Sequence, residues 1–144
     1  MRQAFRRAGG TQKRLCAAVI GQIGEANGGL GELRDNLKYI RRGRGLTFAK
    51  LAECQYVMEV LGDLPLRVAY ERLAGMVRML GEDVQAMALR NAYAIDMPAP
   101  DTLTRRRERI AGIHGLSIDT IELYERNMID ELALRLVHGQ LPVG

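Results

Sequence analysis

Residues 103–132 read LTRRRERIAGIHGLSIDTIELYERNMIDEL. Apolar residues recur three or four positions apart on both sides of Gly115-Leu116-Ser117, which predicts two helices joined by a tight turn. Glycine readily ends a helix, and a serine hydroxyl caps the first turn of the next one. A small core is expected between the two helices, built from Ile110, Ala111, Ile121 and Tyr124. The segment therefore predicts a helix-turn-helix.

Helical periodicity also extends through the rest of the chain. It predicts helices over about 11–27, 31–42, 47–61, 65–80, 83–95, 104–114 and 117–137. No stretch alternates for long enough to predict a strand. We therefore expect an all-α protein of about seven helices, with an N-terminal helical lobe and a C-terminal helix-turn-helix. The expected parts are a flexible basic N-terminus (1–10), a helical lobe for dimerisation or partner contact (11–81) and the helix-turn-helix (82–144).

The composition excludes several classes of protein. The chain has 144 residues, of which 47% are hydrophobic and 26% charged, as in ordinary globular domains. No run approaches the roughly 20 apolar residues of a membrane span, and no convincing secretory signal is present. We expect a cytoplasmic protein with no membrane contact. Cys16 and Cys54 are then expected to be reduced, buried thiols, with a single disulfide between them as the alternative.

The residues that enzymes use are scarce. His114 and His138 are the only histidines, and neither is spaced with a cysteine as zinc ligands are. The sequence has no phosphate-binding glycine loop and no nucleophile elbow. We therefore predict that the protein is not an enzyme and needs no metal and no cofactor.

Charge is distributed unevenly along the chain. Residues 1–50 carry eleven Lys or Arg and three Asp or Glu, whereas residues 51–144 carry ten and fourteen. Such a basic half favours an anionic partner, nucleic acid foremost. The run Arg41, Arg42 and Arg44 is one candidate for phosphate contact. The alternative is a solvated basic turn.

Residues 86–136 resemble region 4 of the sigma-70 family of bacterial sigma factors. Positions that fit its first helix and the start of its second are Leu89, Tyr93, Ile95, Asp96, Leu103 and Thr104. The turn at 115–117 and the apolar stripe through Ile121, Ile129 and Leu132 fit its recognition helix. More weakly, the whole chain resembles helix-turn-helix regulators of high-GC bacteria. The resemblance implies a DNA-associated transcriptional regulator, and a homodimer is the usual state of proteins that bind two-fold operators.

The resemblance also implies a set of nucleic-acid-binding residues. The helix before the turn crosses the DNA backbone in this motif, so its arginines would hold phosphates: Arg105, Arg106, Arg107 and Arg109. Polar groups on the next helix would approach bases or backbone: Ser117, Thr120, Arg126 and Asn127. The alternative for the arginines is a solvated helix face paired with nearby acids.

The second helix departs from the family in its charge. Residues 118–132 hold five acids and one arginine, and carboxylates repel phosphates. This favours an alternative function, a protein-interaction module that docks on RNA polymerase or another regulator without binding DNA. The docking residues would be Ile118, Asp119, Glu122 and Leu123.

Overall fold

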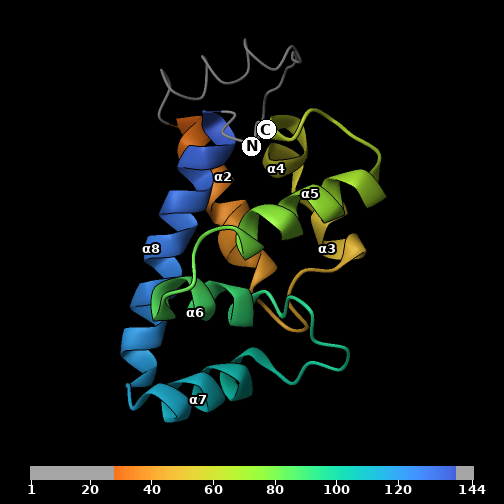
Figure 1. Cartoon of the computed structure of the whole chain (residues 1–144). Helices are drawn as coiled ribbons and strands as arrows, with labels where there is room; N and C mark the ends of the chain where they lie inside the picture. The colour runs from red at the N-terminus through yellow and green to blue at the C-terminus, as the bar shows by residue number, and fades with distance from the viewer. Residues whose placement is uncertain (1–27, 139–144) are drawn as a thin grey trace.

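The computed structural model describes residues 28–138, and all regular structure in this range is helical (Figure 1). The seven described helices are α2 (Gly28–Ile40), α3 (Phe48–Glu53), α4 (Gln55–Val60), α5 (Leu66–Arg78), α6 (Val84–Ala92), α7 (Leu103–His114) and α8 (Ile118–Val137). The all-α prediction is confirmed for these residues. The flexible N-terminus (1–10) and the helix predicted over 11–27 lie outside the described residues.

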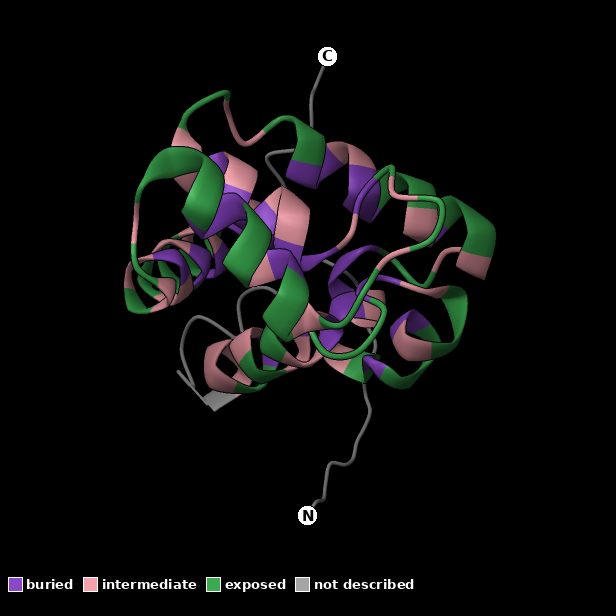
Figure 2. Ribbon diagram, turned by 90° about the horizontal axis from the view of Figure 1, so that it is seen from below, coloured by how far each residue is buried: buried purple, intermediate pink, exposed green. Residues whose placement is uncertain are grey.

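Helix α8 organises the fold. It packs against α2, α6 and α7, while α3, α4 and α5 form the other side of the molecule (Figure 1). Exposed residues follow the outer turns of the helices, and buried residues face inward (Figure 2). Helix α7 lies across the N-terminal end of α8, at the bottom of Figure 1.

The main core takes side chains from both halves of the chain. Fully buried leucines of α2 and α5 meet buried residues of α6 and the C-terminal half of α8, among them Leu33, Leu37, Leu73, Leu89, Ile129 and Leu132. Tyr93 is also fully buried, and its hydroxyl donates to the Leu37 carbonyl at 2.7 Å. The predicted boundary at residues 81 and 82 therefore runs through a shared core.

A second, smaller core joins α6, α7 and α8. Its buried members are Ala88, Ile110, Ala111 and Ile121, with Tyr124 and Leu116 packed against them. The turn has the predicted local geometry: Gly115 has φ +66°, and the Leu116 N–H donates to the Ala111 carbonyl at 2.9 Å. The Ser117 hydroxyl accepts from the Thr120 N–H at 3.1 Å. The residues expected to build this core do so, and α6 adds Ala88.

One predicted helix is divided in the structure. The sequence predicted a single helix over 47–61, but α3 ends at Glu53 and α4 begins at Gln55. The side-chain oxygen of Asn36 in α2 accepts from the Tyr56 and Val57 N–H groups at 3.0 and 3.4 Å. This long-range cap satisfies donors that a helix start leaves unpaired, so it supports a second helix start.

Two helix limits differ from expectation. Helix α2 begins at Gly28, three residues before the predicted start at residue 31. Helix α6 ends at Ala92 rather than near Ile95, because Ala94 adopts φ +56°. The Ile95 N–H then donates to the Arg90 carbonyl and the Ala94 N–H to the Asn91 carbonyl, which is a common way to end a helix. Glycine usually takes this position, so an alanine there did not predict that the helix ends.

Candidate nucleic-acid interface

Arg106 on α7 is fully buried and lies at the centre of the predicted basic region. Its guanidinium has five N–H donors, and each donates to a different backbone carbonyl. Four of these bonds measure 2.8–3.1 Å. The five acceptors are the carbonyls of Arg41, Gly43, Asn91, Ala92 and Asp101.

The acceptors explain how a positive charge is tolerated there. Asn91 and Ala92 end α6, and Arg41 follows the end of α2, so their carbonyls lie at the partially negative ends of two helices. Burial lowers the pKa of Arg106, and the nearby Glu125 carboxylate opposes that shift. Arg106 therefore ties the 41–45 loop, the end of α6 and the start of α7 together.

Glu125 on α8 is the second buried charged residue. Its carboxylate accepts from Arg41 at 2.7 Å and from two nitrogens of Arg107 at 2.7 and 2.9 Å. Arg107 also reaches Glu122 at 3.0 Å. The hydrogen bond to Glu125 raises the pKa of Arg107. We call Arg41, Arg106, Arg107 and Glu125 the inner network.

Three of the predicted phosphate ligands, Arg41, Arg106 and Arg107, belong to the inner network and bond within the protein. Arg106 has no donor left for a phosphate, which corrects the prediction that it holds DNA. Arg41 and Arg107 have largely buried side chains and are engaged by Glu125. These arginines are internal because their carbonyl and carboxylate partners come from other elements, and the linear sequence does not show those partners.

Other arginines of the same two segments are exposed. Arg42 and Arg44 flank Gly43, whose carbonyl binds Arg106, and Arg105 adjoins Arg106 on α7. The bonds of Arg106 thus bring together two basic segments more than 60 residues apart. Arg42, Arg44 and Arg105 make no ion pair among the described residues, and we call these three the basic edge. Arg109 lies on the same helix but pairs with the exposed Asp101 at 3.0 Å.

A half-buried lysine, Lys50, binds the backbone of the loop that carries Arg42 and Arg44. The Lys50 ammonium donates to the Arg42 carbonyl. Burial lowers the pKa of Lys50, and the charge of Arg106 lowers it further. Arg42 in turn lies over the Tyr39 ring, 5.8 Å from its centroid. These contacts hold the 41–45 loop in place while the Arg42 side chain remains exposed.

The predicted polar groups of α8 are partly engaged within the protein. Ser117 and Thr120 bond to each other at the helix start, and Asn127 donates to Gln85 of α6 at 3.1 Å. Arg126 is exposed and makes no ion pair within the described range. Among the residues of the alternative docking surface, Ile118 packs against the second core, whereas Asp119 and Leu123 are exposed.

Most carboxylates of α8 form ion pairs with arginines of the protein, and the one from Glu125 is buried. Glu122 and Glu125 pair with Arg107, and Asp130 and Glu131 pair with other arginines at 2.9 Å. Asp119 is the one carboxylate of the five without an ion pair in the part of the chain that the structure describes. The exposed face of α8 therefore carries carboxylates of which most have an arginine beside them.

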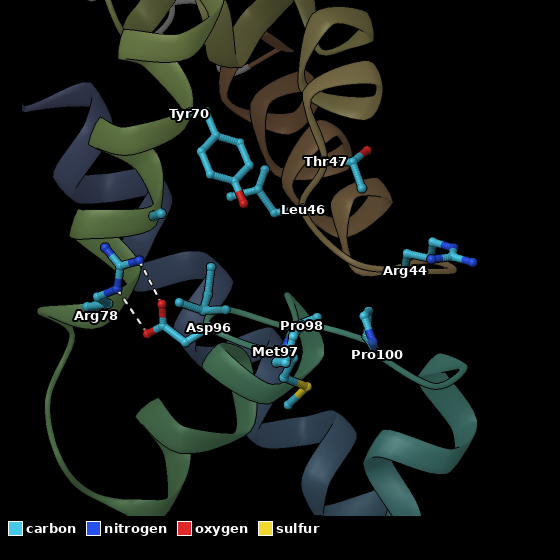
Figure 3. Close-up of a pocket in the computed structure, with 12 residues that line it drawn as sticks. Arg44, Leu46, Thr47, Tyr70, Arg78, Asp96, Met97, Pro98 and Pro100 are labelled. Atoms are coloured by element: carbon cyan, nitrogen blue, oxygen red, sulfur yellow. Dashed lines mark hydrogen bonds and ion pairs between the residues drawn. The ribbon is translucent and has the colours of Figure 1, made fainter.

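A cleft that the sequence did not predict lies between α5 and the segment after α6. It has a volume of about 440 Å³ and an apolar floor that includes Leu46, Ala74 and Ile95. Arg78 and Asp96 form a two-bond ion pair at one side, 3.0 and 3.2 Å between nitrogen and oxygen (Figure 3). The pair holds the pKa of Asp96 below its ordinary value and raises that of Arg78. No short sequence motif marks this site, because its lining comes from three separate segments.

Other kinds of site are absent from the described range. Residues 28–138 contain no group of three His, Cys, Asp or Glu side chains placed to hold a metal ion. Cys54 is a buried free thiol, and burial raises its pKa to about 11. Cys16 lies outside the described residues. Among the helices described, none has the length and apolar character needed to cross a membrane.

Comparison of the chain with protein-family models, curated proteins and solved structures finds no match in any of the three. Function is therefore inferred from the residues of this chain and their geometry.

Proposed function

We propose that this protein is a DNA-associated transcriptional regulator that contacts the phosphate backbone through the basic edge. One observation carries the proposal: the hydrogen bonds of Arg106 hold the 41–45 loop against α7, beside three exposed arginines. Exposed guanidinium groups without carboxylate partners suit phosphate contact, since such contacts need charge and reach rather than a fixed base geometry.

The α7–turn–α8 segment fits this role as a sigma-like helix-turn-helix. In that motif the first helix crosses the DNA backbone and the second lies in the major groove. Arg105 on α7 would then contact a phosphate, and Arg126 is the cation of α8 that makes no ion pair with any residue of 28–138. Because α8 exposes few other free donors, we expect weak discrimination between DNA sequences.

Charge balance limits how strongly the folded part alone can bind. Residues 28–138 carry sixteen Lys or Arg and sixteen Asp or Glu, whereas residues 1–27 carry five Lys or Arg and one Glu. Neutralising phosphates releases counterions, so local clusters of cations matter more than the net charge of the domain. We therefore expect modest affinity, with the basic edge and residues 1–27 both contributing.

The alternative function is a protein-interaction module that docks through α8. It draws less support from the structure, because Glu122 pairs with Arg107 and Ile118 packs against the second core. Asp119 and Leu123 remain exposed, but they make a small surface for docking on RNA polymerase or another regulator.

A salt titration of DNA binding by the full chain tests the proposal. The affinity for a random-sequence duplex should fall steeply between about 50 and 200 mM salt. Arg42→Ala with Arg105→Ala should reduce the slope of log affinity against log salt by about 2, roughly 0.9 for each lost phosphate contact.

The matched control removes two exposed arginines of α5, Arg67→Ala with Arg72→Ala. It changes the net charge equally and should leave the slope within about 0.5 of the parent value, since these groups make no phosphate contact in the proposal. Equal losses in the two double variants would reject the basic edge. No DNA binding at the lowest salt, together with recovery of a bound RNA polymerase subunit, would favour the alternative.

A further inference from the structure

We propose that the cleft between α5 and residues 94–100 is a binding site for a small organic carboxylate with a flat or branched apolar body. The proposal goes beyond DNA binding and does not depend on it. It stands on the geometry of Arg78, on the displaceable character of its present partner and on the shape and lining of the cleft.

The first step concerns Arg78. Its guanidinium already holds a carboxylate in the two-bond arrangement that arginine forms with ligand carboxylates, through Nε and Nη2. The carboxylate is that of Asp96, a residue of the protein itself. Asp96 therefore marks the position and orientation in which a ligand carboxylate would bind.

The second step concerns the strength of the ion pair between Asp96 and Arg78. The side chains of Arg78 and Asp96 are 43% and 66% exposed, and ion pairs so exposed contribute little to stability. Asp96 also has φ +63°, a conformation that aspartate adopts more readily than most side-chain-bearing residues, and Ala94, which follows the end of α6, has φ +56°. Two of the three non-glycine residues with positive φ in the described range lie in this short segment.

The third step concerns the body of the ligand. A volume of about 440 Å³ lies within the range of small-molecule sites. The cleft is open to solvent, and its lining exposes somewhat more polar than apolar surface. Leu46, Ala74 and Ile95 supply the apolar floor, and the hydroxyl end of Tyr70 points toward the middle of the cleft (Figure 3). Arg44 lies on the side of the cleft opposite Arg78 (Figure 3), and two arginines against one aspartate give the lining a positive balance. A negatively charged headgroup is therefore favoured over a positive one.

The same segment connects the cleft to the basic edge. Residues 94–100 line the cleft and lead directly to Asp101, whose carbonyl accepts from Arg106. Arg44 belongs to both the cleft and the basic edge. If the proposed function is right, an occupied cleft should alter DNA affinity. That consequence rests on the proposed function, whereas ligand binding itself does not.

The test is a nuclear magnetic resonance titration of the isotope-labelled full chain with benzoate, without DNA. Benzamide, its neutral isostere, is the matched probe. We expect amide shifts concentrated at Leu46 and residues 94–97, saturation at millimolar benzoate, and at least fivefold weaker binding of benzamide. Equal affinity for the two probes, or shifts spread over other surfaces, would overturn the proposal.

Two variants sharpen the test. Asp96→Asn removes the internal competitor and should tighten benzoate binding roughly fivefold, the factor that corresponds to an exposed ion pair. Arg78→Gln should abolish it. Unchanged dispersion of the amide spectrum shows that each variant is folded. Weaker binding by Asp96→Asn would mean that Asp96 holds the site open rather than occupying it, and would reject the mechanism.

Discussion

Arg105 and Arg106 are neighbours in sequence, yet their surroundings are opposite. Arg105 is exposed and makes no ion pair in the described range, whereas Arg106 is fully buried and bonded to five carbonyls. The second basic segment repeats the contrast, because Arg41 is held by Glu125 while Arg42 and Arg44 face solvent. The arginines of the inner network and of the basic edge thus come from the same two segments, and Glu125 of α8 completes the inner network. Neighbouring arginines of one run can therefore differ completely in burial and pairing, and only the exposed ones are accessible to a partner.

The largest expected effect comes from removing the centre of the inner network. Arg106→Met keeps an unbranched side chain but removes the donor shared by five backbone carbonyls, of which that of Ala92 is in a buried bond. We expect a loss of roughly 3–5 kcal/mol in the free energy of unfolding, measured by urea denaturation. Arg105→Met is the control, and its effect should stay within about 0.5 kcal/mol. Similar losses in the two variants would remove the distinction between inner and outer arginines.

The second largest loss of stability is expected from removing the charge of Glu125, the carboxylate of the inner network. Glu125→Gln leaves Arg41 without its negative partner and Arg107 with Glu122 alone, and we expect a loss of about 2–3 kcal/mol in a urea titration. Glu122→Gln is the matched change on the same helix. Its side chain is 36% exposed, so a loss below about 1 kcal/mol is expected. If Glu122→Gln is the more damaging change, Glu125 is not the main partner of Arg107.

A smaller effect is expected where the 41–45 loop meets the end of α6. Gly45 has φ +85°, and a Cβ there would overlap the Tyr93 carbonyl and lie 2.8 Å from the Ala94 Cβ. Gly45→Ala should therefore cost about 2 kcal/mol and loosen the basic edge, since the Leu46 N–H bonds to the same carbonyl.

The matched control for that change is Gly75→Ala in α5. Gly75 has open space around its Cβ position, and alanine favours a helix interior by about 0.5–1 kcal/mol. The melting temperature should fall for Gly45→Ala and rise for Gly75→Ala. A rise for both would show that the close approach of Gly45 to Tyr93 does not constrain the loop.

The smallest effect concerns an exposed pair outside the inner network. Arg78 holds the pKa of Asp96 below its ordinary value, so the folded state favours the charged carboxylate. The resulting stabilisation is present above the pKa of the unfolded chain, near 4, and is lost as the pH falls through the lower pKa of the folded state. The difference in melting temperature between the parent and Asp96→Asn should shrink between about pH 5 and 2. In an Arg78→Gln background this pH dependence should disappear, and its persistence there would assign it to another group.

Helix positions and the turn were largely predictable from sequence. The periodicity of apolar residues placed the later helices within a few residues, and Gly115 and Ser117 carry local backbone preferences that need no distant partner. The division of α3 from α4 was not predictable, because its cap comes from Asn36 on another helix. The early end of α6 was not predicted either, because Ala94 adopts a backbone conformation that alanine does not favour.

The candidate site was predictable only as a set of basic segments. The sequence by itself determined the helices, the turn and the presence of arginines near residues 41–44 and 105–109, since these follow from periodicity and composition. The tertiary structure decided which arginines are buried, that most carboxylates of α8 face arginines, and that a cleft opens beside Asp96. Burial and pairing depend on carbonyls and carboxylates contributed by other elements, so they exist only once the helices have packed.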